Sequence, residues 1–315
     1  MSCCRATHTS FEEFKTSCTH DDLENAKLLH KKWGFNLGHD DVVGVLLDLC
    51  DSILESDIRI FQWVTDEFNL SKQDIAPPGV KKDWTKSVFH KACGYGRQDI
   101  TAYLKTKYGL SFKDVQTPNL LVSPSDLQDT DMLSWVCGHF PETRDPKYAS
   151  EALQTCFAVN HRIAARWLIK NIFPGLENAQ LVWDTAAKFC CRTDPKTSKT
   201  NAKKILEWTH ECLEYVNPDL NNKAAMRAVV LNNCGIAFQG AVIYHDKETF
   251  EWLMKEFEIT CGQIRGILHV LFPLTCGNNV PNHDMAKYLT DLLGLTSINL
   301  FEMGKRHVFL NPAVE

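Results

Sequence analysis

The stretch ITAYLKTKYGL, residues 100–110, decides the fold class, because its pattern of residues returns along the whole chain. Its apolar positions, from Ile100 to Tyr108, have offsets of 0, 3, 4 and 8. These offsets fall on one stripe of an α-helix, in which successive residues are about 100° apart, and they do not alternate as in a strand. Gly109 follows, and glycine favours a left-handed helix end. The stretch therefore predicts the end of an amphipathic helix.

Seven copies of this ending share an aromatic or large aliphatic residue, here termed the anchor. The anchors are Leu28, Trp63, Tyr103, Trp167, Trp208, Trp252 and Tyr288. The residue after each anchor is apolar except at Thr209. Five residues after the anchors come Trp33, Phe68, Tyr108, Ile172, Leu213, Phe257 and Leu293. The intervals between anchors are 35, 40, 64, 41, 44 and 36 residues. Such periods are typical of stacked helical pairs, with one additional, irregular unit inside the interval of 64.

The anchor helix is the second of each predicted pair, and a shorter first helix precedes it. The marker of the first helix is a cysteine four residues after a large apolar residue. The marker pairs are Phe14 and Cys18, Leu46 and Cys50, Phe89 and Cys93, Leu133 and Cys137, Val230 and Cys234, and Phe272 and Cys276. Small side chains let helices approach closely, so these thiols are expected in the core. Left-handed ends are expected after four second helices, at Gly34, Asn69, Gly109 and Gly294.

The irregular unit lies between Tyr103 and Trp167. Residues 132–137 predict a first helix. Residues 138–149 contain two prolines and no apolar stripe, so the second helix is expected to be missing or reduced to a turn.

The fold predicted from these elements is all-α, a solenoid of helical hairpins with about seven full units and one partial unit. It occupies residues 11–300 and includes the irregular unit near 111–149. The remaining residues, 1–10 and 301–315, are expected to be tails.

The composition is that of a globular protein from inside a cell. The 315 residues are 44% hydrophobic and 23% charged, with a net charge of -5. This charge argues against a chain that coats nucleic acid or anionic membrane by bulk charge. No apolar run has the length of a signal peptide or of the roughly 18 residues that cross a bilayer. Thirteen cysteines, many in helical patterns, favour a reducing cytosol. We expect a cytoplasmic protein without membrane contact.

Residues 91–110, KACGYGRQDITAYLKTKYGL, resemble the degenerate ankyrin-type repeat, in which Ala-Cys, a Gly turn and an aromatic-Leu helix ending recur. The divergent form abundant in large DNA viruses and some protists often continues with Asp-Val or Asp-Ile, as do YGLSFKDV at 108–115 and FNLSKQDI at 68–75. The Thr-Pro-Leu-His-x-Ala opening is absent, and TPNLL at 117–121 comes nearest to it. The β-turn fingers of the family are therefore left open, and a plain two-helix α-solenoid is the structural alternative.

Neither a metal site nor a catalytic site is predicted. Two groups supply ligand types for zinc, but without the paired spacing of a closed site. They are Cys3, Cys4, His8, Cys18 and His20, and then Cys190, Cys191, His210 and Cys212. No Gly-x-Ser-x-Gly, phosphate-binding Gly-Lys-Ser/Thr or His-Glu-x-x-His motif occurs. We predict no enzyme activity, no metal and no cofactor.

Basic clusters are the candidates for partner binding, although a solvated face is the ordinary role of such a cluster. They stand at 30–33, 80–91, 196–204 and 304–307. In an ankyrin-like stack, the first helices and the loops before them line the concave face that usually binds partners. Three candidate residues are expected off the apolar side of a first helix, Lys86, His90 and Lys91. The other three are expected in the loop before that helix, Lys81, Lys82 and Trp84.

The function expected from these features is non-enzymatic binding of a protein partner through the concave face and loops. The resemblance implies an adaptor that acts on cytosolic factors, those of the host if the protein is viral. Nucleic-acid binding through the basic loops is the alternative.

Overall fold

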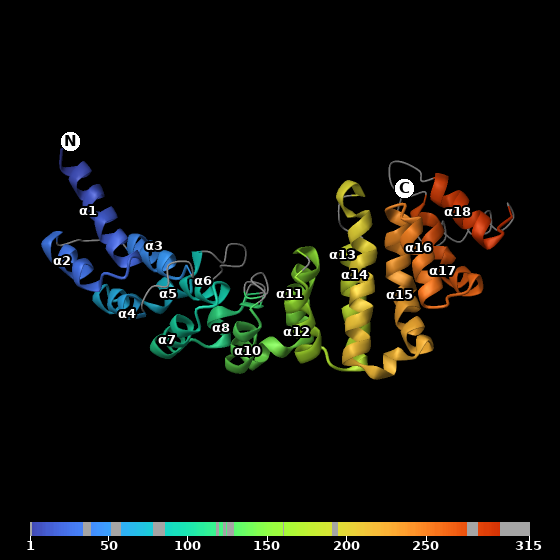
Figure 1. The fold of residues 1–315 in the computed structure, drawn as a ribbon, viewed down its shortest axis with the longest axis horizontal. Coiled ribbons are helices and arrows are strands. Elements are labelled where there is room, and N and C mark those ends of the chain that lie inside the picture. The colour runs from blue at the N-terminus through green and yellow to red at the C-terminus, as the bar shows by residue number, and fades with distance from the viewer. Residues whose placement is uncertain are drawn as a thin grey trace, which may run out of the picture. The chain divides into compact units, whose positions relative to one another are not determined.

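The computed structural model confirms an all-α protein over the residues that it describes, which are 2–33, 39–51, 58–77, 86–117, 120–121, 124, 129–159, 161–190, 195–275 and 283–296. No strand occurs in these ranges (Figure 1). Contacts divide the chain into two compact units, unit 1 from Met1 to Trp167 and unit 2 from Leu168 to Glu315.

The helices that begin in unit 1 are α1 (Ser2–Thr19), α2 (Leu23–Trp33), α3 (His39–Leu49), α4 (Ile58–Glu67), α5 (Lys72–Ile75), α6 (Val88–Gly94), α7 (Gln98–Tyr108), α8 (Phe112–Val115), α10 (Thr130–His139), η3 (Pro141–Arg144), α11 (Pro146–Val159) and α12 (Arg162–Ile172). The helices of unit 2 are α13 (Leu176–Cys190), α14 (Pro195–Val216), η4 (Pro218–Asn221), α15 (Lys223–Ile243), α16 (Lys247–Glu256), α17 (Cys261–Leu274) and α18 (His283–Leu293).

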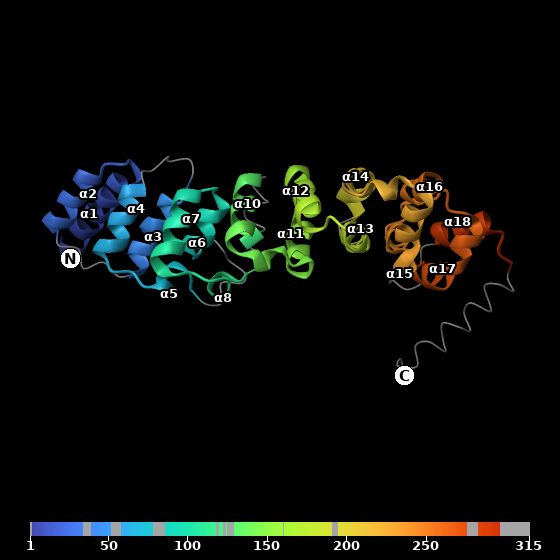
Figure 2. The same ribbon diagram turned by 90° about the horizontal axis from the view of Figure 1, so that it is seen from below.

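Within unit 1 the helices contact one another in the order of the predicted pairs. α1 packs against α2 and α3, and α3 packs against α4 and α6. α6 in turn packs against α7, which also lies against α4. The first helices α1, α3 and α6 therefore follow one another, with α2, α4 and α7 beside them (Figure 2).

Within unit 2 the order is similar. α13 packs against α14 and α15, α15 packs against α16 and α17, and α17 packs against α18. Every anchor lies on the helix that the sequence assigns as the second of its pair, on α2, α4, α7, α12, α14, α16 or α18. The helical pairs of the sequence are therefore present as elements in both units.

Residues in the left-handed region follow four of the second helices, α4, α7, α16 and α18. Asn69, Gly109 and Gly294 have φ angles of 46°, 57° and 57°, which confirms the left-handed ends predicted at these three positions. Gly34 lies outside the described residues. Glu258 holds the equivalent place after α16 with a φ of 51°, although it is neither Gly nor Asn and no sequence signal predicted it.

In three of the described pairs the turn between the two helices also contains a left-handed residue. Asp21, Gly96 and His245 have φ angles of 61°, 71° and 58°. The next residue donates its backbone N–H to a carbonyl five residues earlier, over 3.0 Å for Asp22 and Ser17, 2.9 Å for Arg97 and Ala92, and 2.8 Å for Asp246 and Ala241. This is the Schellman closure of a helix end, which satisfies carbonyls that would otherwise lack a donor.

The short helices α5 and α8 follow α4 and α7 and begin with the same capping box. Ser71 donates its backbone N–H to Asp74 Oδ2 over 2.7 Å, and Ser111 does the same to Asp114 Oδ2 over 2.7 Å. Lys72 Nζ lies 2.7 Å from Asp114 Oδ2, so an ion pair joins α5 to α8. The hydrogen bonds from Lys72 and Ser111 lower the pKa of Asp114 to about 2.

The irregular unit contains α10, which confirms a helix over residues 132–137, and η3 is the turn predicted after it. However, α10 runs alongside α7. Its N-cap residue Asp129 lies against Gly96, in the turn before α7. At the other end, Lys105 Nζ of α7 lies 5.6 Å from the ring centroid of Phe140. α10 therefore takes the place of a second helix, whereas the sequence predicts a first helix here.

This placement gives the irregular unit an anchor of its own. Trp135 on α10 corresponds to Tyr103 on α7, and Val136 after it is fully buried, as Leu104 is. Trp135 divides the interval from Tyr103 to Trp167 into two intervals of 32 residues each. The period therefore continues through the region that the sequence marks as irregular.

α15 is broken by a left-handed turn at residues 232–235. Within this turn, the φ angles of Asn233, Cys234 and Gly235 are 50°, 57° and 62°. This turn exposes Cys234, so the prediction of a packed thiol there is wrong. Large buried side chains toward the end of α15 are instead those of Phe238 and Val242.

Among the described helices, α15 alone has the length and apolar composition of a membrane span. Half of its apolar stretch, however, is buried inside the protein. The break at 232–235 also divides α15 into segments shorter than the roughly 20 helical residues that cross a bilayer.

The core is formed largely by the predicted faces. The thiols at most 2% exposed include Cys18, Cys50, Cys93 and Cys137, which confirms their packing role. Residues directly after anchors are fully buried at Val64, Leu104, Leu168, Leu253 and Leu289. Leu28 and Trp33 are exceptions, because they are 65% and 44% exposed despite their places in an apolar stripe.

Candidate interaction surface

Part of the predicted partner-binding cluster lies within the described residues. Lys86 is exposed two residues before the start of α6. Lys91 is half-buried on α6, and its Nζ lies 5.6 Å from the ring centroid of Tyr95. These residues place two cations and an aromatic ring around α6. The predicted residues that lie outside the described ranges are Lys81, Lys82 and Trp84.

His90 does not belong to that surface, and the expectation that it lies off the buried side of the helix is wrong. The residue is 3% exposed. Its Nδ1 lies 2.8 Å from Ser87 Oγ, and its Nε2 lies 3.1 Å from the carbonyl oxygen of Val115 and 3.0 Å from Thr117 Oγ1. Burial lowers the pKa of His90 to about 4, against the opposing effect of the hydrogen bond to Val115. The neutral imidazole therefore ties α6 to the end of α8.

A repeated contact, here termed the inter-pair joint, connects successive helical pairs. In its first copy, Phe68 lies five residues after the anchor Trp63. Its ring is edge-on to His30 of α2, with centroids 5.0 Å apart, and lies 6.3 Å from the ring of Phe14 on α1. Phe68 thus contacts both helices of the preceding pair.

The second copy of the inter-pair joint is in unit 2. Phe257 also lies five residues after an anchor, Trp252. Its ring centroid is 4.9 Å from that of His210 on α14 and 5.6 Å from that of Trp183 on α13, both edge-on. Again one aromatic side chain contacts both helices of the preceding pair.

The third copy involves α10. Phe140 lies five residues after Trp135, 5.9 Å from the ring of Phe89 on α6 and beneath Lys105 of α7. In all three joints the contact on the second helix is made two residues after its anchor, at His30, Lys105 and His210. The sequence stripe predicts that the residue five after the anchor is apolar, but not which neighbours it meets.

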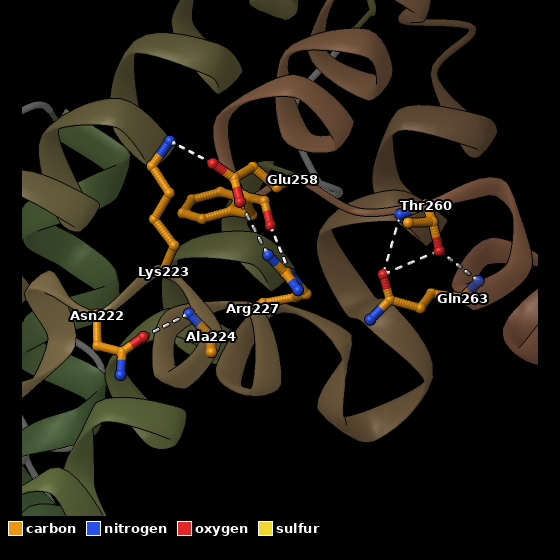
Figure 3. A network of polar contacts seen from close by, with 8 residues as sticks. Asn222, Lys223, Ala224, Arg227, Glu258, Thr260 and Gln263 are labelled. Carbon is orange, nitrogen blue, oxygen red and sulfur yellow. Dashed lines mark hydrogen bonds and ion pairs between the residues drawn. The ribbon is translucent and has the colours of Figure 1, made fainter.

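Charged groups close the end of α16 in unit 2 (Figure 3). Glu258, the left-handed residue, is held by two cations from the start of α15. Lys223 Nζ lies 3.0 Å from its Oε1, and Arg227 Nη2 lies 3.3 Å from its Oε2. The hydrogen bond and charge of Lys223 lower the pKa of Glu258. Arg227 Nε also donates to the carbonyl of Phe257 over 2.7 Å, so α15 caps α16.

The next helix end in unit 2 is closed in the same way. Arg265 of α17 donates to the carbonyl of Leu293, the residue before the left-handed Gly294. α17 itself begins with a capping box, in which Thr260 donates its N–H to Gln263 Oε1 over 2.9 Å (Figure 3). Sequence reasoning missed both arginines, although each stands five residues after the N-cap of its helix, Asn222 or Thr260, because the helix end that each contacts lies about 30 residues further along the chain.

The first helical pair leaves apolar side chains exposed on α2. Leu28 is 65% exposed and Trp33 is 44% exposed. Lys32 Nζ lies 4.8 Å from the centroid of the Trp33 ring, and Lys31 is exposed beside it in the chain. These four residues, Leu28, Lys31, Lys32 and Trp33, are here termed the end surface.

Among the residues that the structure describes, no group of three or more His, Cys, Asp or Glu could hold a metal ion. Cys18 of the first candidate group is fully buried, and burial raises its pKa to about 12. Cys212 of the second group is 1% exposed. Both thiols pack in the core. The side chains of the other cysteines and one histidine of these groups lie outside the described residues: Cys3, Cys4, His8, Cys190 and Cys191.

Comparison with known proteins adds no relative. No protein-family model matches the chain, and no curated protein or solved structure shows significant similarity to it. The ankyrin-type resemblance therefore stays a prediction, and functional inference rests on the contacts described above.

Proposed function

We propose that the chain is a non-enzymatic, ankyrin-like solenoid of helical pairs that binds another protein in the cytoplasm. The observation that carries the proposal is the inter-pair joint, with copies at Phe68, Phe140 and Phe257. In a solenoid each repeat contacts its neighbours, and a reused joint is the contact that such stacking requires. Stacked repeats create an extended ordered surface, which suits the recognition of another macromolecule.

The surface proposed for binding follows the first helices and the loops before them. Lys86, Lys91 and Tyr95 form its described part around α6. Aromatic side chains are enriched in protein interfaces, and cations near them give electrostatic complementarity to an acidic partner. The proposal therefore expects a partner whose contacting segment is acidic.

The test is affinity capture of cellular proteins by the full chain, with wild type compared to K86E/K91E. We expect a protein that wild type retains and that the double variant retains about tenfold less, as for loss of an interface centre. K113E is the matched control, because Lys113 is an exposed lysine of the same unit on α8. It reverses one charge without touching Tyr95.

Two results would count against the proposal. Equal capture by wild type and K86E/K91E would place the interface elsewhere on the chain. The absence of any specifically retained protein, together with turnover of a small molecule by the purified chain, would contradict a non-enzymatic scaffold.

Nucleic-acid binding through the basic segments is the competing proposal. In the cluster at 196–204, Lys203 Nζ lies 2.8 Å from Glu248 Oε1 and 3.9 Å from Glu207 Oε1, so acidic neighbours weaken the positive potential there. Affinity for generic DNA or RNA that falls steeply with rising salt would favour this alternative over a protein scaffold.

A further inference from the structure

The anchor of a later helical pair packs against the second helix of the pair before it. The ring centroids are 6.1 Å apart for Trp63 and His30 of α2, 6.2 Å for Tyr103 and Phe61 of α4, and 5.8 Å for Tyr288 and Phe250 of α16. The anchor thus points toward the preceding pair. In these three pairs, which come from both units, a preceding second helix covers part of the anchor, and Trp63 also lies 6.2 Å from Phe14 of α1.

Leu28 is the anchor of the first pair, and no helix precedes that pair among the described residues. Its side chain is 65% exposed, whereas Trp63 and Tyr103 at the same position of the next pairs are half-buried. Trp33, at the position of the joint residue Phe68, is 44% exposed. In later pairs, the anchor and the residue five positions after it contact the preceding pair. On α2 the residues at these two positions, Leu28 and Trp33, are exposed.

A repeat face that no neighbouring pair covers is normally polar. α2 instead presents Leu28 and Trp33, two large apolar side chains on one helix of 11 residues. Lys31 and Lys32 are exposed next to them. Apolar side chains with a charged rim are typical of a surface that another protein covers.

We propose that the end surface binds an amphipathic α-helix of another protein. Its apolar face covers Leu28 and Trp33, and acidic residues on its rim pair with Lys31 and Lys32. A helix fits because the surface lies where a preceding second helix contacts its neighbour in later pairs. The inference rests on the proposed repeat scaffold and names a second surface, separate from that around Lys86 and Lys91.

The charges decide between a foreign helix and a second copy of this chain. In a two-fold dimer through the end surface, the same patch meets itself. Lys31 and Lys32 of both copies would then gather in one interface, and like charges close together are unfavourable. An acidic helix removes this repulsion and gains opposite-charge contacts.

The test uses fluorescence anisotropy of a labelled peptide of about 20 residues, long enough to form a helix. The peptide carries leucines on one helical face and glutamates elsewhere, and a second peptide replaces every glutamate by lysine. We expect the full chain to bind the glutamate peptide and not the lysine peptide. L28D and K31E/K32E should each weaken binding about tenfold or more.

The matched control is Y215D, because Tyr215 is 68% exposed and lies on α14 of unit 2. It should bind the glutamate peptide like wild type, and so should K86E/K91E. Since Leu28 is exposed, L28D should leave the thermal unfolding midpoint unchanged, which separates a lost surface from a lost fold.

Three outcomes would overturn the end-surface proposal. They are equal binding of both peptides, binding that L28D does not change, and concentration-dependent dimerisation of the free chain that L28D abolishes. The last result, seen by sedimentation, would assign the surface to a second copy. Capture that depends on Lys86 and Lys91 would remain in each case, so failure here is distinguishable from failure of the scaffold.

Discussion

Phe68 lies edge-on against His30, with ring centroids 5.0 Å apart, and so connects one helical pair to the next. Edge-to-face aromatic pairs contribute about 0.5–1.5 kcal/mol beyond the burial of their area. The ring of Phe14, 6.3 Å from Phe68, extends the same contact to the first helix of the preceding pair. A single aromatic side chain therefore adds to the helix contacts that hold neighbouring pairs together.

F68A should lower the free energy of unfolding of unit 1 by about 2–4 kcal/mol, because it removes apolar contacts to both helices of the preceding pair and leaves a cavity. Urea denaturation followed by circular dichroism measures the change. Y215A, which truncates a ring that is 68% exposed, should change stability by less than about 0.5 kcal/mol. Equal effects of the two variants would show that the joint does not stabilise the stack.

His90 should make stability depend on pH below neutrality. Its pKa is about 4 in the folded protein and 6.5 when unperturbed, so the unfolded chain binds the proton more readily. The contribution is complete above about pH 6.5 and is lost as the pH falls toward 4, by up to about 3 kcal/mol. Urea midpoints of wild type and H90Q, taken at pH 7 and pH 5, measure the difference. H139Q, a change at an exposed histidine of the same unit, should keep the wild-type pH dependence.

Gly109 should tolerate alanine poorly, because its φ of 57° is unfavourable for a residue with a Cβ. G109A is expected to cost about 1 kcal/mol, although no atom crowds the position. G44A is the opposite case. Gly44 lies inside α3 with open space around it, so alanine there should stabilise by about 0.5–1 kcal/mol. Differential scanning calorimetry of both variants should show midpoint shifts of opposite sign.

Alkylation should distinguish the thiols by burial. Cys234 and Cys261 are exposed, whereas Cys18, Cys50 and Cys93 are fully buried. Burial raises the pKa of Cys50 to about 12, so little reactive thiolate forms at pH 8. Iodoacetamide followed by peptide mass spectrometry should label the two exposed thiols in the native protein and the other three only in urea. Labelling of Cys50 at the native rate of Cys234 would contradict the packing described.

Arg227 should contribute more than Lys223 to the stability of unit 2, although both contact Glu258. Arg227 also donates to the carbonyl of Phe257, and its side chain is 25% exposed against 57% for Lys223. R227A should destabilise unit 2 by about 1–2 kcal/mol, because a charge-assisted hydrogen bond is lost. K223A should have an effect of less than about 0.5 kcal/mol, since exposed ion pairs contribute little. Urea denaturation of both variants under identical salt tests the order.

The sequence predicts what depends on local periodicity. The stripe around Tyr103 identifies the second helices, because one face of each must be apolar along its own length. Asn69, Gly109 and Gly294 mark helix ends for a reason that is also local, the backbone freedom of Gly and Asn. Glu258 has the same conformation without that freedom, since Arg227 and Lys223 hold it from another helix.

Features that depend on neighbouring pairs could not be predicted in this way. Contacts such as that of Phe140 with Lys105 place α10 as a second helix, whereas its own short apolar stripe fits either helix of a pair. His90 falls on the polar side of its stripe but is buried by Val115 and Thr117, which come from the end of the same pair. Of the described candidates, Lys86 and Lys91 are accessible as the charge pattern indicates.

The inter-pair joint also has a consequence for how the chain acquires its structure. Each joint unites residues from consecutive pairs, as with Phe68 and His30, so no joint waits for distant parts of the chain to meet. Proteins dominated by such local contacts have low contact order and fold rapidly. In the proposed solenoid, folding that starts at any pair would extend by adding the next one, and synthesis from the N-terminus would deliver the pairs in the order in which they dock.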